Sequence, residues 1–201
     1  MRVAVLALQG AFAEHEEMLE RLGADHFQIR QKKDLDTPFD ALILPGGEST
    51  VIGKLLRDEG MFEELRTRIQ NGLPVFGTCA GMILLAEKVE GGTPCLGTME
   101  IQVKRNAYGR QLGSFYTEDK FDDMREPVPM TFIRAPYVEQ VWGGARALAE
   151  VDGHIVAARQ GNQLVTAFHP ELGQDPRIHE YFLKMAASAG NIPSSTLSKA
   201  G

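Results

Sequence analysis

One cysteine lies between two glycines in the segment Gly77-Thr78-Cys79-Ala80-Gly81. The apolar residues 74–76 before it predict a short buried strand, and residues 82–86 after it predict a helix, so Cys79 falls at the turn between them. A Gly-x-nucleophile-x-Gly turn strains its central residue, and glycines avoid collisions with neighbouring strands. A helix N-terminus also stabilises a thiolate. The pattern favours a nucleophilic thiol, and the alternative is a buried structural cysteine.

A general base for such a thiol is predicted at the end of another buried strand. Residues 163–168 read as that strand, which runs directly into His169-Pro170-Glu171. Because proline ends regular sheet pairing and stiffens the backbone, the imidazole and the carboxylate can be held in a fixed relation. We expect a Cys-His-Glu triad in which His169 takes the thiol proton and later protonates a leaving amine, while Glu171 orients the ring.

The alternative for His169 is an ordinary polar residue in a loop. The remaining histidines lack its context, since they fall in helical patterns or near predicted strand starts: His15, His26, His154 and His179.

Backbone donors for an oxyanion are predicted after a third buried strand. A glycine pair follows the strand of residues 41–44. We expect the amides of Gly47 and Ala80, the latter just after the nucleophile, to form an oxyanion hole. The same segment also reads as an ordinary strand-to-helix loop in which Ser49 or Thr50 caps a helix, and both interpretations can hold together.

Composition and charge are those of one compact domain. The chain has 201 residues, 43% of them hydrophobic, which is enough to bury a full core. We expect a single domain over residues 1–187 and a disordered polar tail over residues 188–201. The net charge of −6, with Lys and Arg scattered among acidic residues, argues against nucleic acid as a partner.

The sequence lacks a run of about 18 apolar residues that could span a membrane. It enters a predicted strand at once, without a signal-peptide cleavage region, so we expect a cytoplasmic protein with no membrane partner. The two cysteines, Cys79 and Cys95, offer neither a disulfide framework nor a metal-ligand spacing. We therefore expect no metal and no cofactor, and interpret Cys95 as structural.

Strands and helices alternate through the first half of the predicted fold. An apolar strand over residues 3–8 precedes an amphipathic helix over residues 13–22. The alternation continues with strands 27–30, 41–44 and 74–76 and with helices 51–57 and 61–70. This order favours an α/β fold with three layers, a mostly parallel sheet covered by helices on both faces. Since ligands gather at the carboxyl ends of such strands, we expect the glycine pair, Cys79 and His169 along one edge.

The second half predicts an antiparallel extension of the sheet. Strands 100–105, 130–133, 154–159 and 163–168 are separated by short turns, and residues 160–162 join the last two as a hairpin. A closing helix is predicted from Asp175-Pro176 to about residue 187.

Several segments together resemble the triad-type glutamine amidotransferases. Three carry this likeness: Gly-Thr-Cys-Ala-Gly at 77–81, Leu-Pro-Gly-Gly-Glu-Ser-Thr at 44–50 and Phe-His-Pro-Glu at 168–171. Four more resemble the glutaminase subunits of glutamine-dependent pyridoxal 5'-phosphate synthases: Leu8–Ala11, Val103–Asn106, Tyr108–Gln111 and Phe132–Pro136. The resemblance spans the chain to about residue 187 and implies a flavodoxin-like core.

The resemblance implies hydrolysis of L-glutamine to L-glutamate and ammonia. The ammonia would pass to a separate (β/α)8-barrel synthase subunit that makes pyridoxal 5'-phosphate. The triad would be Cys79, His169 and Glu171. The glutamine-binding positions of the family fall on Gly47, Glu48, Ser49, Arg105, Ile133 and Arg134.

The charges at these positions suit free glutamine, which carries an ammonium and a carboxylate. Glu48 would hold the ammonium, and Arg105 and Arg134 would hold the carboxylate; the alternative for both arginines is simple surface solvation. A chain filled by the glutaminase fold has no room for an ammonia acceptor, so we expect a partner subunit and weak activity without it. The resemblance implies that the partner switches on this activity through the oxyanion loop, here residues 46–47, whose glycines permit the peptide bond to flip.

Three other interpretations remain open. The chain could be the glutaminase of a different biosynthetic complex, although residues 108–111 and 132–136 argue against it. It could be another hydrolase on the same core. It could also be a binding module with an inactive cysteine turn, although no triad member is missing.

Overall fold

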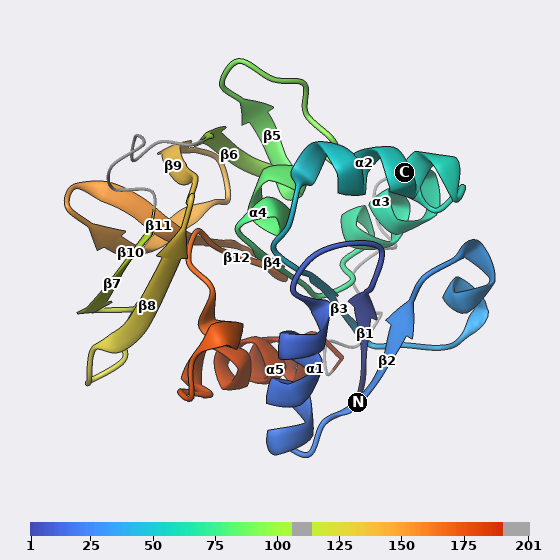
Figure 1. Cartoon of the computed structure of the whole chain (residues 1–201), viewed down its shortest axis with the longest axis horizontal. Coiled ribbons are helices and arrows are strands. Elements are labelled where there is room, and N and C mark those ends of the chain that lie inside the picture. Colours follow the sequence, from blue (N-terminus) through green and yellow to red (C-terminus); the bar gives the residue numbers. More distant parts are fainter. Residues whose placement is uncertain (106–113, 191–201) are drawn as a thin grey trace, which may run out of the picture.

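The computed structural model describes residues 1–105 and 114–190. Within them, ten strands form one sheet in the order β2-β1-β3-β4-β12-β11-β9-β6-β5, with β10 paired to β11, and two more strands pair separately as β7-β8. Figure 1 shows this sheet running through the molecule with helices on either side. The arrangement confirms the expected α/β class with three layers.

The first five strands of the sheet order are all parallel. They are β2 (Asp25–Ile29), β1 (Arg2–Leu6), β3 (Ala41–Leu44), β4 (Val75–Thr78) and β12 (Gln163–Thr166). Every residue of β3 and β4 is buried, as expected for strands covered on both faces. The order 2-1-3-4 followed by a fifth parallel strand is that of the flavodoxin-like fold.

Helices cover both faces of this parallel half. The bounds are α1 (Phe12–Arg21), α2 (Ser49–Asp58), α3 (Phe62–Gln70), α4 (Ala80–Leu85) and α5 (Arg177–Gly190), with short 3-10 turns η1 (Lys32–Asp36) and η2 (Pro170–Leu172). In Figure 1, α1 and α5 lie together on one side of the sheet, and α2, α3 and α4 lie on the other. Helix α1 turns its buried Met18 and Leu19 inward and is followed by Gly23 at φ +67.

The antiparallel extension continues the sheet beyond β12. Its strands are β11 (His154–Gln160), β9 (Tyr137–Val141), β6 (Met99–Lys104) and β10 (Arg146–Val151), while β5 (Ala86–Val89) pairs with β6 in parallel at the end of the sheet. The predicted hairpin is confirmed, because Gln160 pairs with Gln163 across the turn. The separate pair consists of β7 (Ser114–Asp119) and β8 (Val128–Ile133).

Four strands had no counterpart among the sequence predictions, namely β5, β7, β9 and β10. Strands β7 and β9 carry partly exposed polar residues, and β5 directly continues α4, so none of these three strands gives a clear apolar run. The closing helix α5 begins at Arg177, after Asp175 accepts a hydrogen bond from its amide, and extends to Gly190.

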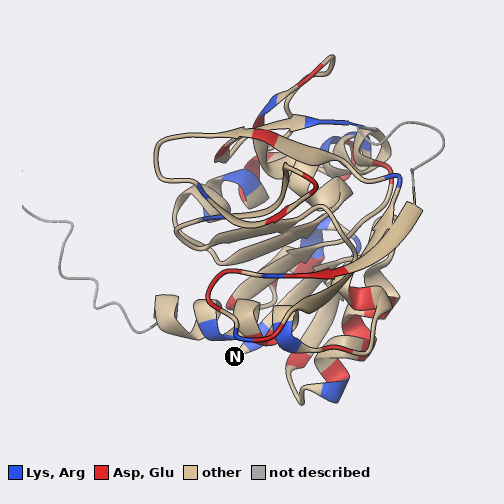
Figure 2. Cartoon of the chain, turned by 90° about the vertical axis from the view of Figure 1, so that its left-hand side faces the viewer, with Lys and Arg blue, Asp and Glu red and all other residues tan. Residues whose placement is uncertain are grey.

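Two predictions fall outside the described residues. The segment 108–111, used for the family resemblance, is one, and most of the predicted tail of residues 188–201 is the other. Over residues 1–105 and 114–190, no helix has both the length and the apolar character needed to cross a membrane. On the side shown in Figure 2, Lys and Arg of the described chain are interspersed with Asp and Glu.

Candidate active site

Cys79 lies between the end of β4 and the start of α4 in a strained backbone conformation, with φ 49 and ψ −99. The flanking glycines are required by close packing. A Cβ on Gly81 would lie 2.1 Å from the carbonyl oxygen of Leu44 in β3, and one on Gly77 would lie 2.6 Å from the backbone of Gly81. The predicted strand-turn-helix geometry around the cysteine is therefore present.

Strand pairing brings the histidine segment to the cysteine. Thr78 pairs with Thr166 in the parallel register of β4 and β12, and the amide of Cys79 donates to the carbonyl of Thr166 at 2.8 Å. The chain then leaves β12, and the amide of His169 donates to the carbonyl of Thr131 in β8 at 2.8 Å. Two adjacent strand ends thus hold Cys79 and His169 at the same edge of the sheet.

The three candidate triad side chains are in contact. Nδ1 of His169 lies 2.7 Å from Oε1 of Glu171, and the His169 ring also interacts with the side chain of Cys79. Burial by itself would lower the pKa of His169, but hydrogen bonds and charge interactions with Cys79 and Glu171 raise it to about 10. The imidazole is thus protonated at neutral pH and can donate a proton there.

The glycine loop packs directly against this group. A Cβ on Gly46 would lie 2.4 Å from the His169 ring and 3.5 Å from Cβ of Cys79. The carbonyl of Gly46 accepts a hydrogen bond from the amide of Ala11 at 2.9 Å. Because a trans peptide directs its N–H opposite to its carbonyl, the amide of Gly47 points away from that segment. Ala80 is fully buried at the N-terminus of α4, where amides lack intrahelical partners.

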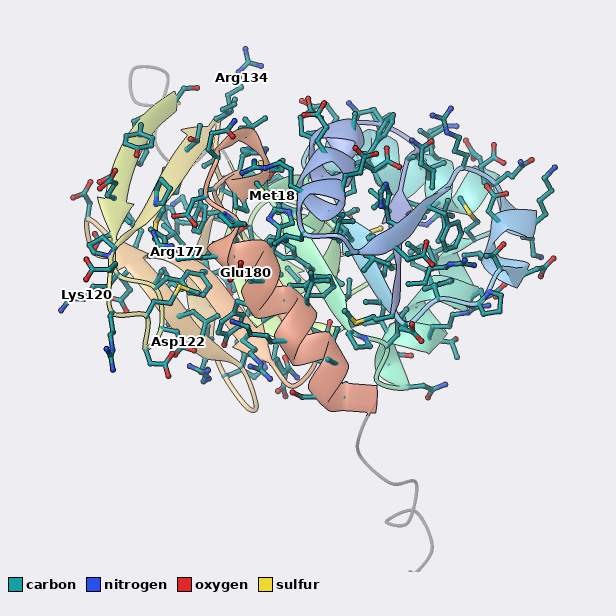
Figure 3. The ribbon with its side chains drawn as sticks, turned by 90° about the horizontal axis from the view of Figure 1, so that it is seen from below. Met18, Lys120, Asp122, Arg134, Arg177 and Glu180 are labelled. Atoms are coloured by element: carbon teal, nitrogen blue, oxygen red, sulfur yellow. The ribbon has the colours of Figure 1, made fainter. Side chains whose placement is uncertain are left out.

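A cleft of about 820 Å³ opens over Cys79 and His169. All six predicted substrate-binding residues line it, namely Gly47, Glu48, Ser49, Arg105, Ile133 and Arg134. Nε of Arg105 is buried without a hydrogen-bond partner among the described residues. Arg134 is exposed at the end of β8, with φ +45, and projects into solvent (Figure 3). The lining of the cleft thus includes two cationic side chains, Arg105 and Arg134, and one carboxylate, Glu48.

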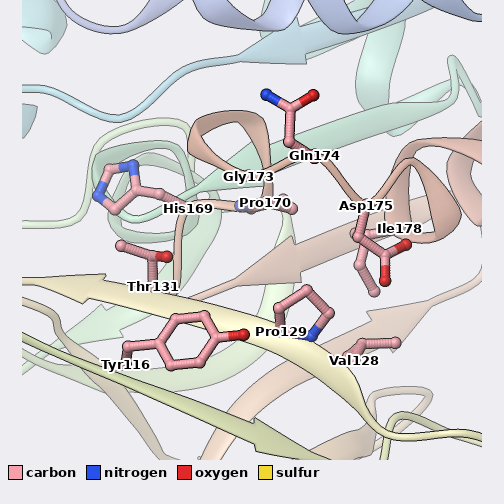
Figure 4. A pocket seen from close by; sticks show the side chains of 10 residues that line it. All are labelled: Tyr116, Val128, Pro129, Thr131, His169, Pro170, Gly173, Gln174, Asp175 and Ile178. Atoms are coloured by element: carbon pink, nitrogen blue, oxygen red, sulfur yellow. The ribbon is translucent and has the colours of Figure 1, made fainter.

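A second, smaller cavity of about 280 Å³ borders the other side of His169. Figure 4 shows the ring and Thr131 at one end of it, with Asp175 and Ile178 at the other. Its lining comes mainly from β8 and from residues 169–175, the segment around the η2 turn. Each of the two cavities therefore reaches the imidazole.

One predicted contact is wrong. Neither Ser49 nor Thr50 caps α2: the N-cap residue is Glu48, and no side chain caps it. The amide of Glu48 instead donates to Oε1 of Gln9 at 2.8 Å, from the segment after β1. Sequence reasoning assigned Gln9 no role, although β1 and β3 are adjacent parallel strands whose carboxyl ends meet.

Two further histidines are close to the triad. His15 of α1 and His179 of α5 are fully buried. Their rings are hydrogen-bonded, with 2.9 Å between Nδ1 of His15 and Nε2 of His179. Nε2 of His15 lies 3.7 Å from Oε2 of Glu171. The sequence placed both histidines in helices correctly but set them aside, because the packing of α1 against α5 has no signature in either helix.

Comparisons with known proteins give the family of the chain. A model of the SNO glutamine amidotransferase family matches residues 5–188. A protein of Methanocorpusculum labreanum named pyridoxal 5'-phosphate synthase subunit PdxT is 60% identical over 187 residues, covering 93% of this chain and 98% of that protein. One of the same name from Desulfitobacterium hafniense (strain Y51) is 54% identical over 194 residues, covering 96% and 97%.

Two solved structures are also similar to this chain. One described as a glutamine amidotransferase superposes with a TM-score of 0.86 at 46% identity, covering 92% of this chain and 98% of the other. PurLQS from Thermotoga maritima, at 16% identity and a TM-score of 0.64, shares the fold. On the family match and these identities, the chain belongs to the SNO glutamine amidotransferase family.

Proposed function

We propose that this chain is the glutaminase subunit of a pyridoxal 5'-phosphate synthase. It hydrolyses L-glutamine to L-glutamate and ammonia and supplies the ammonia to a synthase subunit. The observation that carries this proposal is the contact of Cys79, His169 and Glu171 at the base of a cleft. The relatives named pyridoxal 5'-phosphate synthase subunit PdxT, at 60% and 54% identity, favour this complex over other amidotransferases.

The reaction starts with attack of the Cys79 sulfur on the side-chain amide carbon of glutamine. The oxygen of the tetrahedral intermediate accepts hydrogen bonds from the amides of Gly47 and Ala80. His169 gives its proton to the departing nitrogen, and ammonia leaves as the glutamyl thioester forms. Water then attacks the thioester while His169 accepts a proton, and glutamate leaves as the sulfur is restored. Glu171 orients the ring and stabilises its charged form throughout.

Glutamine binds by its charged end at the outer part of the cleft. Arg105 and Arg134 pair with the carboxylate, and Glu48 pairs with the ammonium, while Ser49 and Ile133 complete the walls. Nε of Arg105 has no hydrogen-bond partner within residues 1–105 and 114–190, which supports this assignment, because a buried donor gains most from an anionic partner. The side-chain amide of glutamine then extends toward Cys79.

The synthase partner, in our proposal a (β/α)8 barrel, docks around the mouth of this cleft. Ile133 and Leu172 line the cleft with 42% and 41% of their surface exposed, and Val51, which follows the lining residues Ser49 and Thr50 in sequence, is 44% exposed. Exposed apolar side chains around one opening are typical of an interface. Both subunits would work in the cytoplasm.

The decisive experiment follows pyridoxal 5'-phosphate formation when the chain, a matched synthase, L-glutamine and the sugar phosphates are combined. We expect formation with glutamine to depend on Cys79, while Cys79→Ala still permits formation when ammonium replaces glutamine. Glutamate release should be slow for the isolated chain and rise when the synthase is added. Failure of glutamine to support formation, in a mixture that works with ammonium, would overturn the proposal.

A further inference from the structure

The acid of the candidate triad has a second polar neighbour on the side away from His169. Glu171 is completely buried, and its Oε1 contacts His169. Its other oxygen, Oε2, has no hydrogen bond among the described residues, and Nε2 of His15 lies 3.7 Å from it. A buried carboxylate oxygen without a donor is costly, so a donor this close is significant.

The same ring nitrogen also reaches the strand that carries the nucleophile. Nε2 of His15 lies 3.1 Å from Oγ1 of Thr78, the residue directly before Cys79. His15 thus stands between the end of β4 and the η2 turn that carries Glu171. Its ring is held in place by edge contacts with Phe76 and by His179.

The charge state of His15 is neutral. Complete burial, together with the nearby His179 and His169, keeps the pKa of His15 well below its ordinary value, and burial lowers the pKa of His179 to about 4. Each neutral ring has one N–H. If Nε2 of His179 donates to Nδ1 of His15, then Nε2 of His15 carries the hydrogen and faces Glu171 and Thr78. The other tautomer would bury an N–H at Nδ1 of His179, an atom that has no hydrogen-bond partner in the described part of the chain.

We propose that His15 is a positioning residue that donates its Nε2 hydrogen to Oε2 of Glu171 and so fixes the carboxylate that orients His169. His179 selects the tautomer of His15 that makes this possible. At 3.7 Å the N–H of His15 attracts the buried carboxylate already in the free chain, and catalytic hydrogen bonds are often longer without substrate than with it. The proposal rests on the triad function assigned above and extends it by two side chains from α1 and α5.

The test compares two amides at position 15. The nitrogen of a glutamine side chain reaches as far as Nε2 of histidine, whereas that of asparagine reaches only as far as Nδ1. His15→Gln therefore keeps a donor toward Glu171, and His15→Asn removes it. Leu19→Val, a buried change on the same helix, is the matched control for a general loss of stability.

Two readouts are required. In the complex with the synthase, we expect His15→Asn to lower kcat for glutamine by about 10-fold to 100-fold with little change in KM, because the ring of His169 loses its alignment. In the isolated chain, nitrogen NMR should show a lower pKa for His169 in His15→Asn than in the wild type. His15→Gln should recover most of both properties, and Leu19→Val should match the wild type in both while lowering the melting temperature.

The proposal is overturned if His169 titrates alike in His15→Asn and the wild type, or if His15→Gln is no better than His15→Asn. A wild-type complex that fails to hydrolyse glutamine would count against the proposed function instead. The NMR comparison would still decide the role of His15, because it needs no substrate.

Discussion

Glu171 and His169 are two residues apart in sequence, and their side chains meet with 2.7 Å between Oε1 and Nδ1. Pro170 between them starts the η2 turn, which brings both side chains to the same side of the chain. The carboxylate has no exposed surface, so its charge acts on the imidazole with little screening. This contact is one cause of the raised pKa of His169.

Replacing that charge should slow catalysis without unfolding the protein. Glu171→Gln keeps the size of the side chain and an oxygen that can accept from Nδ1, but it removes the charge that stabilises the imidazolium. We expect kcat for glutamine to fall by about 10²-fold to 10⁴-fold. The pKa of His169 should fall from about 10, as measured by NMR. An unchanged pKa would mean that Glu171 does not act on the ring.

Arg105 should govern substrate affinity. Arg105→Met removes the cation proposed to bind the glutamine carboxylate, which is worth about 1.5–3 kcal/mol for a charged hydrogen bond. We expect KM for glutamine to rise by about 10-fold to 100-fold at nearly constant kcat, because the contact is equally strong in the ground and transition states. Lys54→Met, at an exposed position on α2, is the control. Equal KM values for both variants would show that Arg105 does not bind the glutamine carboxylate.

The cysteine turn should tolerate no side chain at position 81. Gly81→Ala places a Cβ 2.1 Å from the carbonyl oxygen of Leu44, so β3 and α4 must separate. We expect a loss of about 1–3 kcal/mol in the free energy of unfolding, together with loss of activity. Gly173→Ala is the control, since its Cβ would meet only ordinary contacts at 3.7 Å or more. Urea unfolding of both variants measures the difference, and equal stability would refute the packing argument.

The buried histidine pair predicts sensitivity to acid. The pKa of His179 is lowered by burial from 6.5 to about 4 in the folded protein, so the unfolded chain binds a proton first as the pH falls. The contribution of the neutral His179 ring to the free energy of unfolding is fully present above about pH 6.5, the pKa of the unfolded chain. This contribution is lost as the pH falls toward 4, the pKa in the folded protein. The loss for His179 is roughly 3 kcal/mol, and His15 adds to it in the same direction.

Removing the ring nitrogen should flatten this dependence. His179→Phe keeps a ring beside Phe76 but binds no proton, so its free energy of unfolding should fall less between pH 7 and pH 4 than that of the wild type. Phe182→Leu, a buried change on the same helix that alters no titratable group, should keep the wild-type slope. Identical slopes for wild type and His179→Phe would show that this histidine is not a source of acid sensitivity.

Much of the site could be predicted from sequence because it lies at strand ends. The strand of residues 41–44 has the predicted bounds, and Cys79 and His169 follow strands that pair in the structure. Apolar runs mark buried parallel strands clearly, and such strands deliver their next residues to one edge. The family resemblance, rather than the pattern, pointed to Arg105 and Arg134.

The contacts that could not be predicted from the sequence depend on packing between segments that are distant in the chain. His15 and His179 meet because α1 and α5 lie on the same face of the sheet, 164 positions apart in the chain. The Gln9 contact with Glu48 likewise requires β1 and β3 to be neighbours. The partly exposed strands β7 and β9 have too little apolar alternation to be recognised.

The most direct test of the central claim is covalent labelling with a glutamine analogue that carries an electrophilic ketone in place of the side-chain amide. We expect one added mass per chain, located by peptide mass spectrometry on Cys79. An excess of L-glutamine should suppress this label, and Cys79→Ala should abolish it. Labelling of Cys95 instead, or no labelling of a folded chain in complex with its synthase, would contradict the assignment of Cys79 as the glutaminase nucleophile.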